Sequence, residues 1–304
     1  MDKTVAGRRP KTIAWYQIEI ERFIEFAGDK PVADLNLEDG QKWVLHMMQG
    51  NRYEGHPNRK EIQGPVSVSS INGRIRAIKN FSKYLDEEGF TEADVFRKIH
   101  QQREPRRVVE VLSDEEKNRL IDATKPDTML GCRMLVILAM LIDTGMRVSE
   151  LAGIKLEDVD FKQSRILVTG KGGKQRFVPI GPNSVKVLIR WINRYRPNVN
   201  DNALLIDREA KPMSTSAIQK SLKVLGTNVG IPRIHPHLLR HSFGTDWLIH
   251  GGDLFSLQEV LGHSDLETTK VYVEMSRVQL DVKHRAISPF DRLGVGKKLK
   301  KTGT

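Results

Sequence analysis

Cysteine is nearly absent from this sequence of 304 residues, in which Cys132 is the single one. One cysteine cannot form an internal disulfide, and its place beside the apolar run MLVILAMLI predicts a buried core residue rather than a nucleophile. A reducing, cytoplasmic location fits this cysteine usage. Long hydrophobic runs are also missing: the run at 134–142 is too short to span a bilayer, and the N-terminal MDKTVAGRRPK lacks the apolar core of a signal peptide. We therefore expect no membrane partner and no export segment.

Acidic residues are in the minority, since 49 Lys and Arg face 38 Asp and Glu, and the net charge is +11. Residues 1–111 contain 19 basic and 17 acidic residues, whereas residues 112–304 contain 30 and 21, so the excess lies mostly in the second part. A basic surface attracts polyanions, of which nucleic acid is the commonest, and the alternative is a basic surface that binds nothing. The hydrophobic content of 39% is that of a globular protein, and the length favours two domains.

Amphipathic helices are expected in the first hundred residues, within 11–28, around 38–50 and within 68–89. In the first, apolar residues recur at helical spacing and Gly28 lies at the position of a C-terminal cap; these apolar residues are Ile13, Tyr16, Ile20, Phe23 and Ile24. The third has an apolar inner face of Ile71, Ile75, Ile78 and Leu85. Its opposite side carries a polar ridge, a candidate DNA contact with a merely solvated face as the alternative: Asn72, Arg76, Lys79 and Lys83.

Polar and basic residues without helical period surround Pro105, so we place a linker at 106–111 between a first domain at 1–105 and a second that starts at 112. Ser113 and Glu116 form a capping box at the start of the second domain. After the apolar helix, Gly145 breaks the helix, which sets Arg147 at a junction before a new helix. The runs SRILVTG and KQRFVPI flank KGGK and predict a β-hairpin with Lys171 at its tip. The remainder is predicted to be helical.

The segment HPHLLRHSF places His237 and Arg240 three residues apart, on one face of a helix, where they can address one ligand. The histidines at 235, 237 and 241 could also suggest a metal site. The adjacent guanidinium repels a divalent cation, however, and no carboxylate or cysteine completes the ligand set, so we expect no metal ion here. The loop GKGGK lacks the spacing of a nucleotide-binding loop. Lys174, the last residue of this loop, and Arg176 shortly after it are DNA-binding candidates, with an exposed basic hairpin as the alternative.

In LGHSDLETTKVYV, Gly262 is expected to end a helix, and Ser264 with Glu267 to open another that carries Tyr272. A tyrosine is a poor nucleophile at neutral pH unless positive charge and a proton acceptor activate it. The ordered segments TGMRVSEL, VTGKGGK, HPHLLRHSFGT, LGHSDL and TTKVYV resemble the motifs of the tyrosine recombinase family, also called phage integrases, and most closely its Xer-like members. The resemblance extends to the N-terminal helices, which look like the family's core-binding domain.

The resemblance implies a role for each matching residue. Tyr272 would be the nucleophile that forms a 3′-phosphotyrosyl bond with DNA. Arg147 and Arg240 would grip the non-bridging phosphate oxygens. Lys171 would be the general acid, His237 would assist proton transfer from the tyrosine, and His263 would donate a hydrogen bond to the phosphate. Glu150 matches the family's acidic position and would orient these groups. No cofactor, metal or ATP is implied.

The resemblance also implies a mostly α-helical fold with a small antiparallel β-sheet in a catalytic domain at 112–285. With the helical core-binding domain it would form a two-domain, C-shaped clamp on double-stranded DNA. Recombination would be carried out by a tetramer on two sites, as a homo-oligomer or with a related subunit, in integration, excision or dimer resolution. The tail at 286–304 would dock onto a neighbouring subunit. The alternatives are a type IB topoisomerase, a non-catalytic DNA-binding accessory protein and a metal-dependent nuclease.

Overall fold

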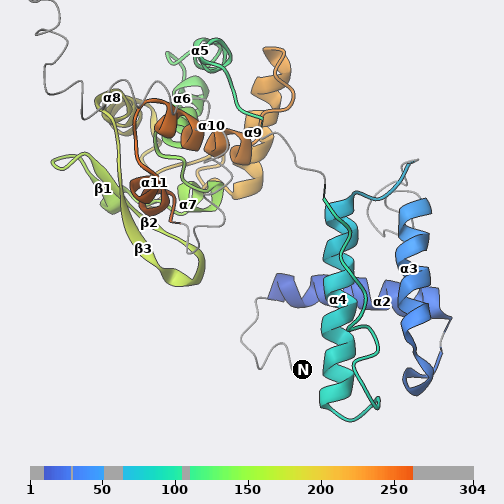
Figure 1. Ribbon diagram of the computed structural model, residues 1–304. Coiled ribbons are helices and arrows are strands. Elements are labelled where there is room, and N and C mark those ends of the chain that lie inside the picture. Colours follow the sequence, from blue (N-terminus) through green and yellow to red (C-terminus); the bar gives the residue numbers. More distant parts are fainter. Residues whose placement is uncertain (1–9, 29, 51–63, 105–109, 263–304) are drawn as a thin grey trace, which may run out of the picture. The chain divides into compact units, whose positions relative to one another are not determined.

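The computed structural model describes residues 10–28, 30–50, 64–104 and 110–262 (Figure 1). The chain divides into two compact units, Met1–Arg107 and Val108–Thr304. The point of division lies inside the segment 106–111. As predicted, the described residues are mostly helical with a small antiparallel sheet, which belongs to the second unit. Among the helices of the described ranges, none combines the length and the apolar character needed to cross a membrane.

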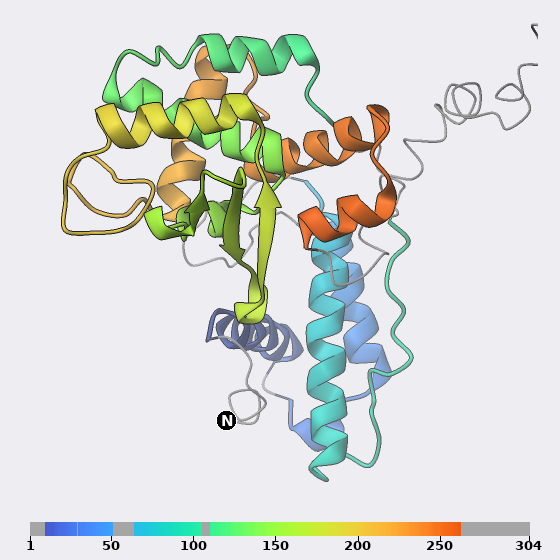
Figure 2. The same cartoon turned by 90° about the vertical axis from the view of Figure 1, so that its left-hand side faces the viewer.

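The first unit contains α2 (Pro10–Ala27), α3 (Leu37–Gln49) and α4 (Val68–Glu87), with α3 beside α4 and α2 crossing them (Figures 1 and 2). Asn36 caps α3 in a reciprocal capping box with Asp39, which satisfies backbone N–H groups that a helix start leaves unpaired. The core is aromatic: the Phe23 ring packs edge-on against Trp43 and Phe96, with centroids 5.4 and 5.2 Å apart. These contacts join α2, α3 and the segment after α4.

The inner face of α4 is as predicted, because Ile71, Ile75, Ile78 and Leu85 are all buried. The predicted inner face of α2 is partly wrong. Phe23 is fully buried, but Ile24 is 42% exposed and the polar Glu19 is buried instead. Glu19 accepts ion pairs from Arg22 at 3.0 Å and from Arg74 of α4 at 3.1 Å, and this pairing compensates for the burial of its charge. The buried face of α2 therefore includes a glutamate paired with another helix, which apolar spacing alone does not predict.

The second unit has a main apolar core, and the helices α10 and α11 form a second, smaller apolar cluster. Its helices are α5 (Asp114–Asp122), α6 (Met129–Thr144), α7 (Val148–Ala152), α8 (Pro182–Arg190), α9 (Thr215–Asn228), α10 (Pro236–Ile249) and α11 (Leu254–Leu261). The capping box of Ser113 and Glu116 starts α5 as predicted, and Cys132 is fully buried in α6 as predicted. The part after residue 183 that was predicted to be helical is not one regular α-helix, because α8 is followed by a π-helical turn at Trp191–Tyr195.

The predicted hairpin is present and gains a third strand. Strands β1 (Val159–Asp160), β2 (Arg165–Thr169) and β3 (Gln175–Pro179) form an antiparallel sheet in the order β1-β2-β3. The turn between β2 and β3 includes Lys171 and two glycines with positive φ, Gly172 and Gly173, which only glycine adopts readily. In β3 the side chain of Val178 is buried and its neighbours in sequence face outward, the alternation of a sheet with one covered face.

Candidate active site

The junction between α6 and α7 is built around Gly145. This residue ends α6 in the left-handed conformation with φ 59°, and its amide bonds to Leu141. A Cβ atom at Gly145 would lie 2.3 Å from a ring carbon of Phe243 in α10 and 2.8 Å from a methyl carbon of Leu261 in α11. Glycine is therefore required both by conformation and by space. The close approach brings the end of α6 against α10 and the end of α11.

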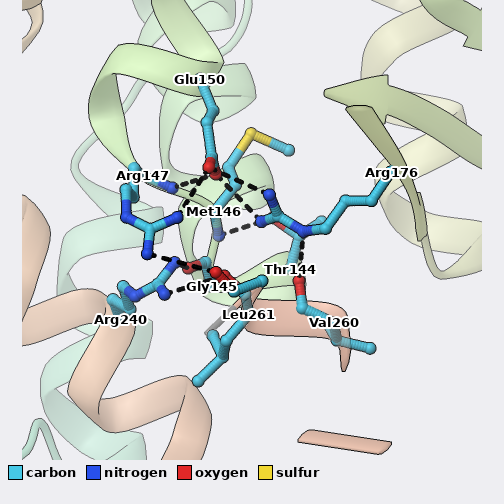
Figure 3. Close-up of polar contacts among 10 residues, drawn as sticks. Thr144, Gly145, Met146, Arg147, Glu150, Arg176, Arg240, Val260 and Leu261 are labelled. Atoms are coloured by element: carbon cyan, nitrogen blue, oxygen red, sulfur yellow. Dashed lines mark hydrogen bonds and ion pairs between the residues drawn. The ribbon is translucent and has the colours of Figure 1, made fainter. Parts of the chain in front are cut away.

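Arg240 of α10 fixes this approach from inside. It is only 6% exposed, and its Nη1 donates to the carbonyl of Gly145 at 2.8 Å while its Nη2 donates to the carbonyl of Leu261 at 2.9 Å (Figure 3). Both acceptors are carbonyls at the C-terminal ends of helices, where the backbone lacks its own partner. Arg240 thus joins α6, α10 and α11 at one point.

Arg147 lies on the same junction but is more open. Its backbone N–H donates to Oε2 of Glu150 at 2.8 Å, and its Nη1 donates to Oε1 of the same carboxylate at 2.9 Å. Its Nη2 lies 3.5 Å from the carbonyl of Gly262, the residue that follows the Arg240 acceptor Leu261. The side chain of Arg147 is 35% exposed. Two guanidinium groups therefore meet at the end of α11, and that of Arg147 is the more exposed of the two.

Glu150 is the buried centre of the cluster, with a side chain that is 1% exposed. Burial by itself raises the pKa of a carboxyl, but the hydrogen bonds from Arg176 and Arg147 outweigh burial and lower the pKa of Glu150 below its ordinary value. Arg176 of β3 donates to both carboxylate oxygens at 3.0 Å (Figure 3). Glu150 is thus an ionised anchor that two arginines from different elements share.

His237 projects from the first turn of α10, three residues before Arg240. Partial desolvation, the neighbouring His235 and the positive charges of Arg240 and Arg147 all lower the pKa of His237 below the ordinary 6.5. The ring is therefore neutral at neutral pH and can accept a proton. His235 bonds through Nδ1 to the carbonyl of Arg233 at 2.7 Å, a local contact. Within the described ranges, no three His, Cys, Asp or Glu side chains gather as a metal site would require.

The two segments that carry the other predicted catalytic residues begin at this cluster. Lys171 lies on the β2–β3 turn directly after Gly170, and a Cβ at Gly170 would lie 3.4 Å from Oε1 of Glu150. Gly262 ends α11 as predicted, with φ 64°. His263 and Tyr272 come after it and lie outside the described residues. The structure therefore brings Arg147, Glu150, Arg240 and His237 together.

The six DNA-binding candidates are placed very differently. The ridge predicted on α4 is not uniformly exposed, because Asn72 is 6% exposed and donates to the carbonyl of Gln102 at 2.9 Å, and Lys79 donates to the carbonyls of Arg97 and Ile99. These two residues hold the chain that follows α4, a structural task that the helical spacing could not reveal. The exposed candidates are Arg76, Lys83, which pairs with Glu87, and Lys174.

The sixth DNA-binding candidate is Arg176, for which an exposed basic hairpin was the alternative, and the structure does not show an exposed side chain here. Its side chain is 16% exposed and its guanidinium binds Glu150 and the carbonyl of Val260. A signal for this placement is present in the sequence. Side chains in a strand alternate, so Arg176 shares the inward phase of the buried Val178 and Ile180, whereas Phe177 points outward and is 50% exposed.

A buried carboxylate thus holds guanidinium groups together in a helical domain with a small sheet, and guanidinium groups suit the geometry of a phosphate. The phage integrase family model matches residues 110–277. The tyrosine recombinase XerC of Pediococcus pentosaceus is 31% identical over 290 residues, covering 92% of each chain. The chain belongs to the phage integrase family of tyrosine recombinases, enzymes that cleave and rejoin DNA.

Solved structures agree with this fold. The crystal structure of XerA recombinase matches with a TM-score of 0.53 and 28% identity, covering 93% of this chain and 94% of that one. XerH recombinase in a post-cleavage complex with a palindromic difH substrate matches with a TM-score of 0.69 and 19% identity, covering 92% and 79%. Both are recombinases, and this similarity does not favour the topoisomerase alternative.

Proposed function

We propose that this chain is a site-specific recombinase that cleaves duplex DNA with Tyr272 and rejoins it to a different end. The phenol oxygen attacks the phosphorus, the bond to the 5′-oxygen breaks, and a 3′-phosphotyrosyl linkage and a free 5′-hydroxyl result. The reverse attack by a 5′-hydroxyl of another strand completes the exchange. The bond energy is retained in the covalent linkage, so each step is nearly balanced and no ATP is consumed.

The observation that carries the proposal is the pair of guanidinium groups at the end of α11. Arg147 and Arg240 reach the consecutive carbonyls of Gly262 and Leu261, and both are anchored through the α6–α7 junction. Planar guanidinium forks match the geometry of phosphate oxygens and stabilise charge that develops on a pentacoordinate phosphorus. Removal of one such donor costs about 3 kcal/mol in the barrier, or roughly a hundredfold in rate.

Proton transfers complete the mechanism. His237, whose lowered pKa keeps it neutral, accepts the proton of the Tyr272 phenol as it attacks. Lys171 on the β2–β3 turn donates a proton to the departing 5′-oxygen, and His263 donates a hydrogen bond to the phosphate. Glu150 touches no substrate in this scheme and orients Arg147 from the buried side. Charge on phosphorus is neutralised by side chains, so the proposal requires no metal ion.

The proposed partner is a double-stranded recombination site. The excess of basic residues after position 111 favours a polyanion, and the related fold of XerH occurs in a complex with its difH substrate. We propose further that two DNA sites are joined by a tetramer of this chain or of this chain with a related subunit. The tail at 286–304, with apolar Ile287, Phe290 and Leu293, is the proposed contact between subunits.

A nicked duplex that loses a short fragment after cleavage traps the covalent complex and tests the proposal. The parent chain is expected to form a protein–DNA adduct that resists denaturant, and Tyr272→Phe is expected to form none. Persistence of the adduct in Tyr272→Phe assigns the nucleophile to another residue. The same assay with EDTA is expected to give an unchanged rate, whereas a metal-dependent nuclease would be abolished.

Deletion of residues 286–304 tests the proposed subunit contact. We expect strand exchange between two sites to fall strongly while binding to a single site is retained, because the contact serves assembly. Gel-shift titration and a two-plasmid recombination assay measure the two quantities. Equal loss of both contradicts a role in assembly.

A further inference from the structure

We propose that Arg176 is a positioning residue of the active site and not a contact to DNA. In this view it neutralises Glu150 and ties the β2–β3 hairpin to the end of α11, which leaves the charge of Arg147 available to the phosphate. The inference rests on the proposed function, since it concerns the same phosphate site. It goes further by assigning a task to a residue outside the set that contacts the substrate.

The bonding of Arg176 leaves little of its guanidinium for a ligand. Nη1 and Nη2 each lie 3.0 Å from one oxygen of Glu150, a two-pronged pair, and Nε donates to the carbonyl of Val260 in α11 at 2.9 Å. All three nitrogen atoms are therefore engaged within the protein (Figure 3). The side chain is 16% exposed, compared with 35% for Arg147. One side chain thus joins the strand β3, the short helix α7 and the end of α11.

Charge balance explains why the cluster needs a second arginine. Glu150 accepts four hydrogen bonds, two from Arg176 and two from Arg147. Three guanidinium groups and one carboxylate leave two positive charges at the site, and removal of Arg176 leaves one. A buried carboxylate that loses one partner draws on the other, because an uncompensated buried charge is costly. Arg147 would then be neutralised from inside, and its attraction for a phosphate would weaken.

The position of Arg176 links the two catalytic segments. A Cβ at Gly262 would lie 2.8 Å from Nη1 and 2.9 Å from Cζ of Arg176, and a Cβ at Gly170 would lie 3.8 Å from the same Nη1. Gly170 directly precedes Lys171, and Gly262 directly precedes His263. The ion pair of Arg176 and Glu150 thus lies against the backbone from which both proposed catalytic residues extend.

Replacement of Arg176 by methionine tests the inference in single-turnover cleavage with DNA in excess. We expect the cleavage rate of Arg176→Met to fall by about tenfold or more, while the affinity for DNA and its salt dependence stay close to those of the parent. A residue that binds a phosphate adds about 0.9 to the slope of log affinity against log salt, so a lost contact is visible in this slope.

Arg165→Met is the matched control. Arg165 lies on the adjacent strand β2, pairs with Asp160 at 3.3 Å and has no role in the site, so its removal takes the same charge from the same sheet.

The double variant Glu150→Gln with Arg176→Met separates charge compensation from general damage. If Arg176 acts by neutralising Glu150, removal of both charges restores cleavage several-fold above Arg176→Met, because the orphaned carboxylate is gone. Arg176→Lys keeps the charge without the two-pronged geometry and is expected to lie between parent and Arg176→Met. Circular dichroism and thermal unfolding establish that each variant folds. If Arg176→Met does not fold, the comparison rests on Arg176→Lys, alone and combined with Glu150→Gln.

The possible failures are distinguishable. A parent chain that forms no covalent adduct overturns the proposed function and the inference with it. A parent that cleaves, together with an Arg176→Met variant whose salt slope drops by about 1 and whose rate at saturating DNA is unchanged, overturns only the inference and makes Arg176 a phosphate contact. A double variant that is no more active than the single Arg176 variant also overturns it.

Discussion

At the residue scale, the two arginines that meet at the end of α11 differ in how far they are buried. Arg240 is buried and spends two donors on carbonyls at the ends of α6 and α11. Arg147 donates to Glu150 through Nη1 and to the carbonyl of Gly262 through Nη2, and its side chain is 35% exposed. These hydrogen bonds fix the direction of each guanidinium group in the free protein. Groups that are oriented before a substrate binds contribute most to electrostatic catalysis.

The variant Arg147→Lys tests whether the planar guanidinium of Arg147 is needed. An ammonium is a point charge that cannot bind Glu150 and a phosphate with a planar fork, so we expect the cleavage rate to fall about a hundredfold with a much smaller change in DNA affinity. The measurement is single-turnover cleavage of the nicked duplex. Arg165→Lys, on β2, serves as control. A variant that cleaves at the parental rate contradicts the assignment of Arg147.

His237 gives a pH prediction. Its folded-state pKa lies below the ordinary 6.5, so the neutral form persists to lower pH than in a free histidine. We expect cleavage to stay level as pH falls through 6.5 and to decline only below it, because a protonated ring cannot accept the phenol proton. The same depressed pKa contributes stability that is present above 6.5 and lost as pH falls through the folded-state value.

The control for this pH profile is His241, one turn further along α10. Desolvation and the charges of its neighbours lower the pKa of His241 as well, but it has no assigned role. His241→Gln should therefore retain the acidic decline, and His237→Gln should abolish it with an overall loss of rate. A decline that disappears with His241→Gln instead would assign the proton acceptor to His241.

At the element scale, the site is set by how helices end. Both α6 and α11 end in a left-handed glycine, Gly145 and Gly262, and the carbonyls freed at these ends are the acceptors for Arg240 and Arg147. Polar groups that a helix leaves unpaired thus become the supports of the guanidinium groups. The strand β3 adds Arg176 from the other side.

A comparison of Gly262→Ala with Gly230→Ala tests whether the end of α11 is closely packed at Gly262. Both glycines have positive φ, 64° and 72°, so both substitutions strain the backbone, by about 1 kcal/mol in the free energy of unfolding. At Gly230 nothing lies within 4 Å of the added carbon, whereas at Gly262 it meets the Arg176 guanidinium at 2.8 Å. We expect urea unfolding to show a larger loss for Gly262→Ala, and only this variant to cleave more slowly. Equal effects of the two substitutions contradict a packed contact at Gly262.

The elements themselves could be predicted from sequence where the signal is local. Capping by Ser113 and Glu116, the apolar spacing of Ile71, Ile75 and Ile78, and the strand–KGGK–strand pattern each depend on neighbours along the chain. Glu19 shows the limit, because this buried carboxylate of α2 pairs with Arg74 of α4. A contact across 55 residues of sequence leaves no periodic trace.

The sequence indicated which side chains gather at the candidate site, and it did not indicate the backbone groups that hold them. Arg147, His237 and Arg240 were identified through their motifs, and the structure brings them together with Glu150. The carbonyls of Gly145 and Leu261 are backbone groups without a sequence signature. Arg176 was a DNA-binding candidate because of its charge, and its inward phase in β3 is the sequence signal for its contacts with Glu150 and Val260.

At the scale of the whole molecule, charge is distributed unequally between the two units. The excess of basic residues lies mainly after residue 111, in the part that contains the site. In the first unit, Asn72 and Lys79 are engaged in holding the chain after α4, which leaves Arg76 and Lys83 as the exposed basic candidates on that helix. We therefore expect the first unit to contribute fewer phosphate contacts than the ridge of four residues implied.

Peptide mapping of the trapped adduct shows directly whether Tyr272 is the residue that is joined to DNA. Trypsin releases residues 271–277, VYVEMSR, which contain Tyr272 as their single tyrosine. After nuclease digestion, mass spectrometry should find a nucleotide remnant on Tyr272 of this peptide. A remnant on any other residue of the chain would contradict the account.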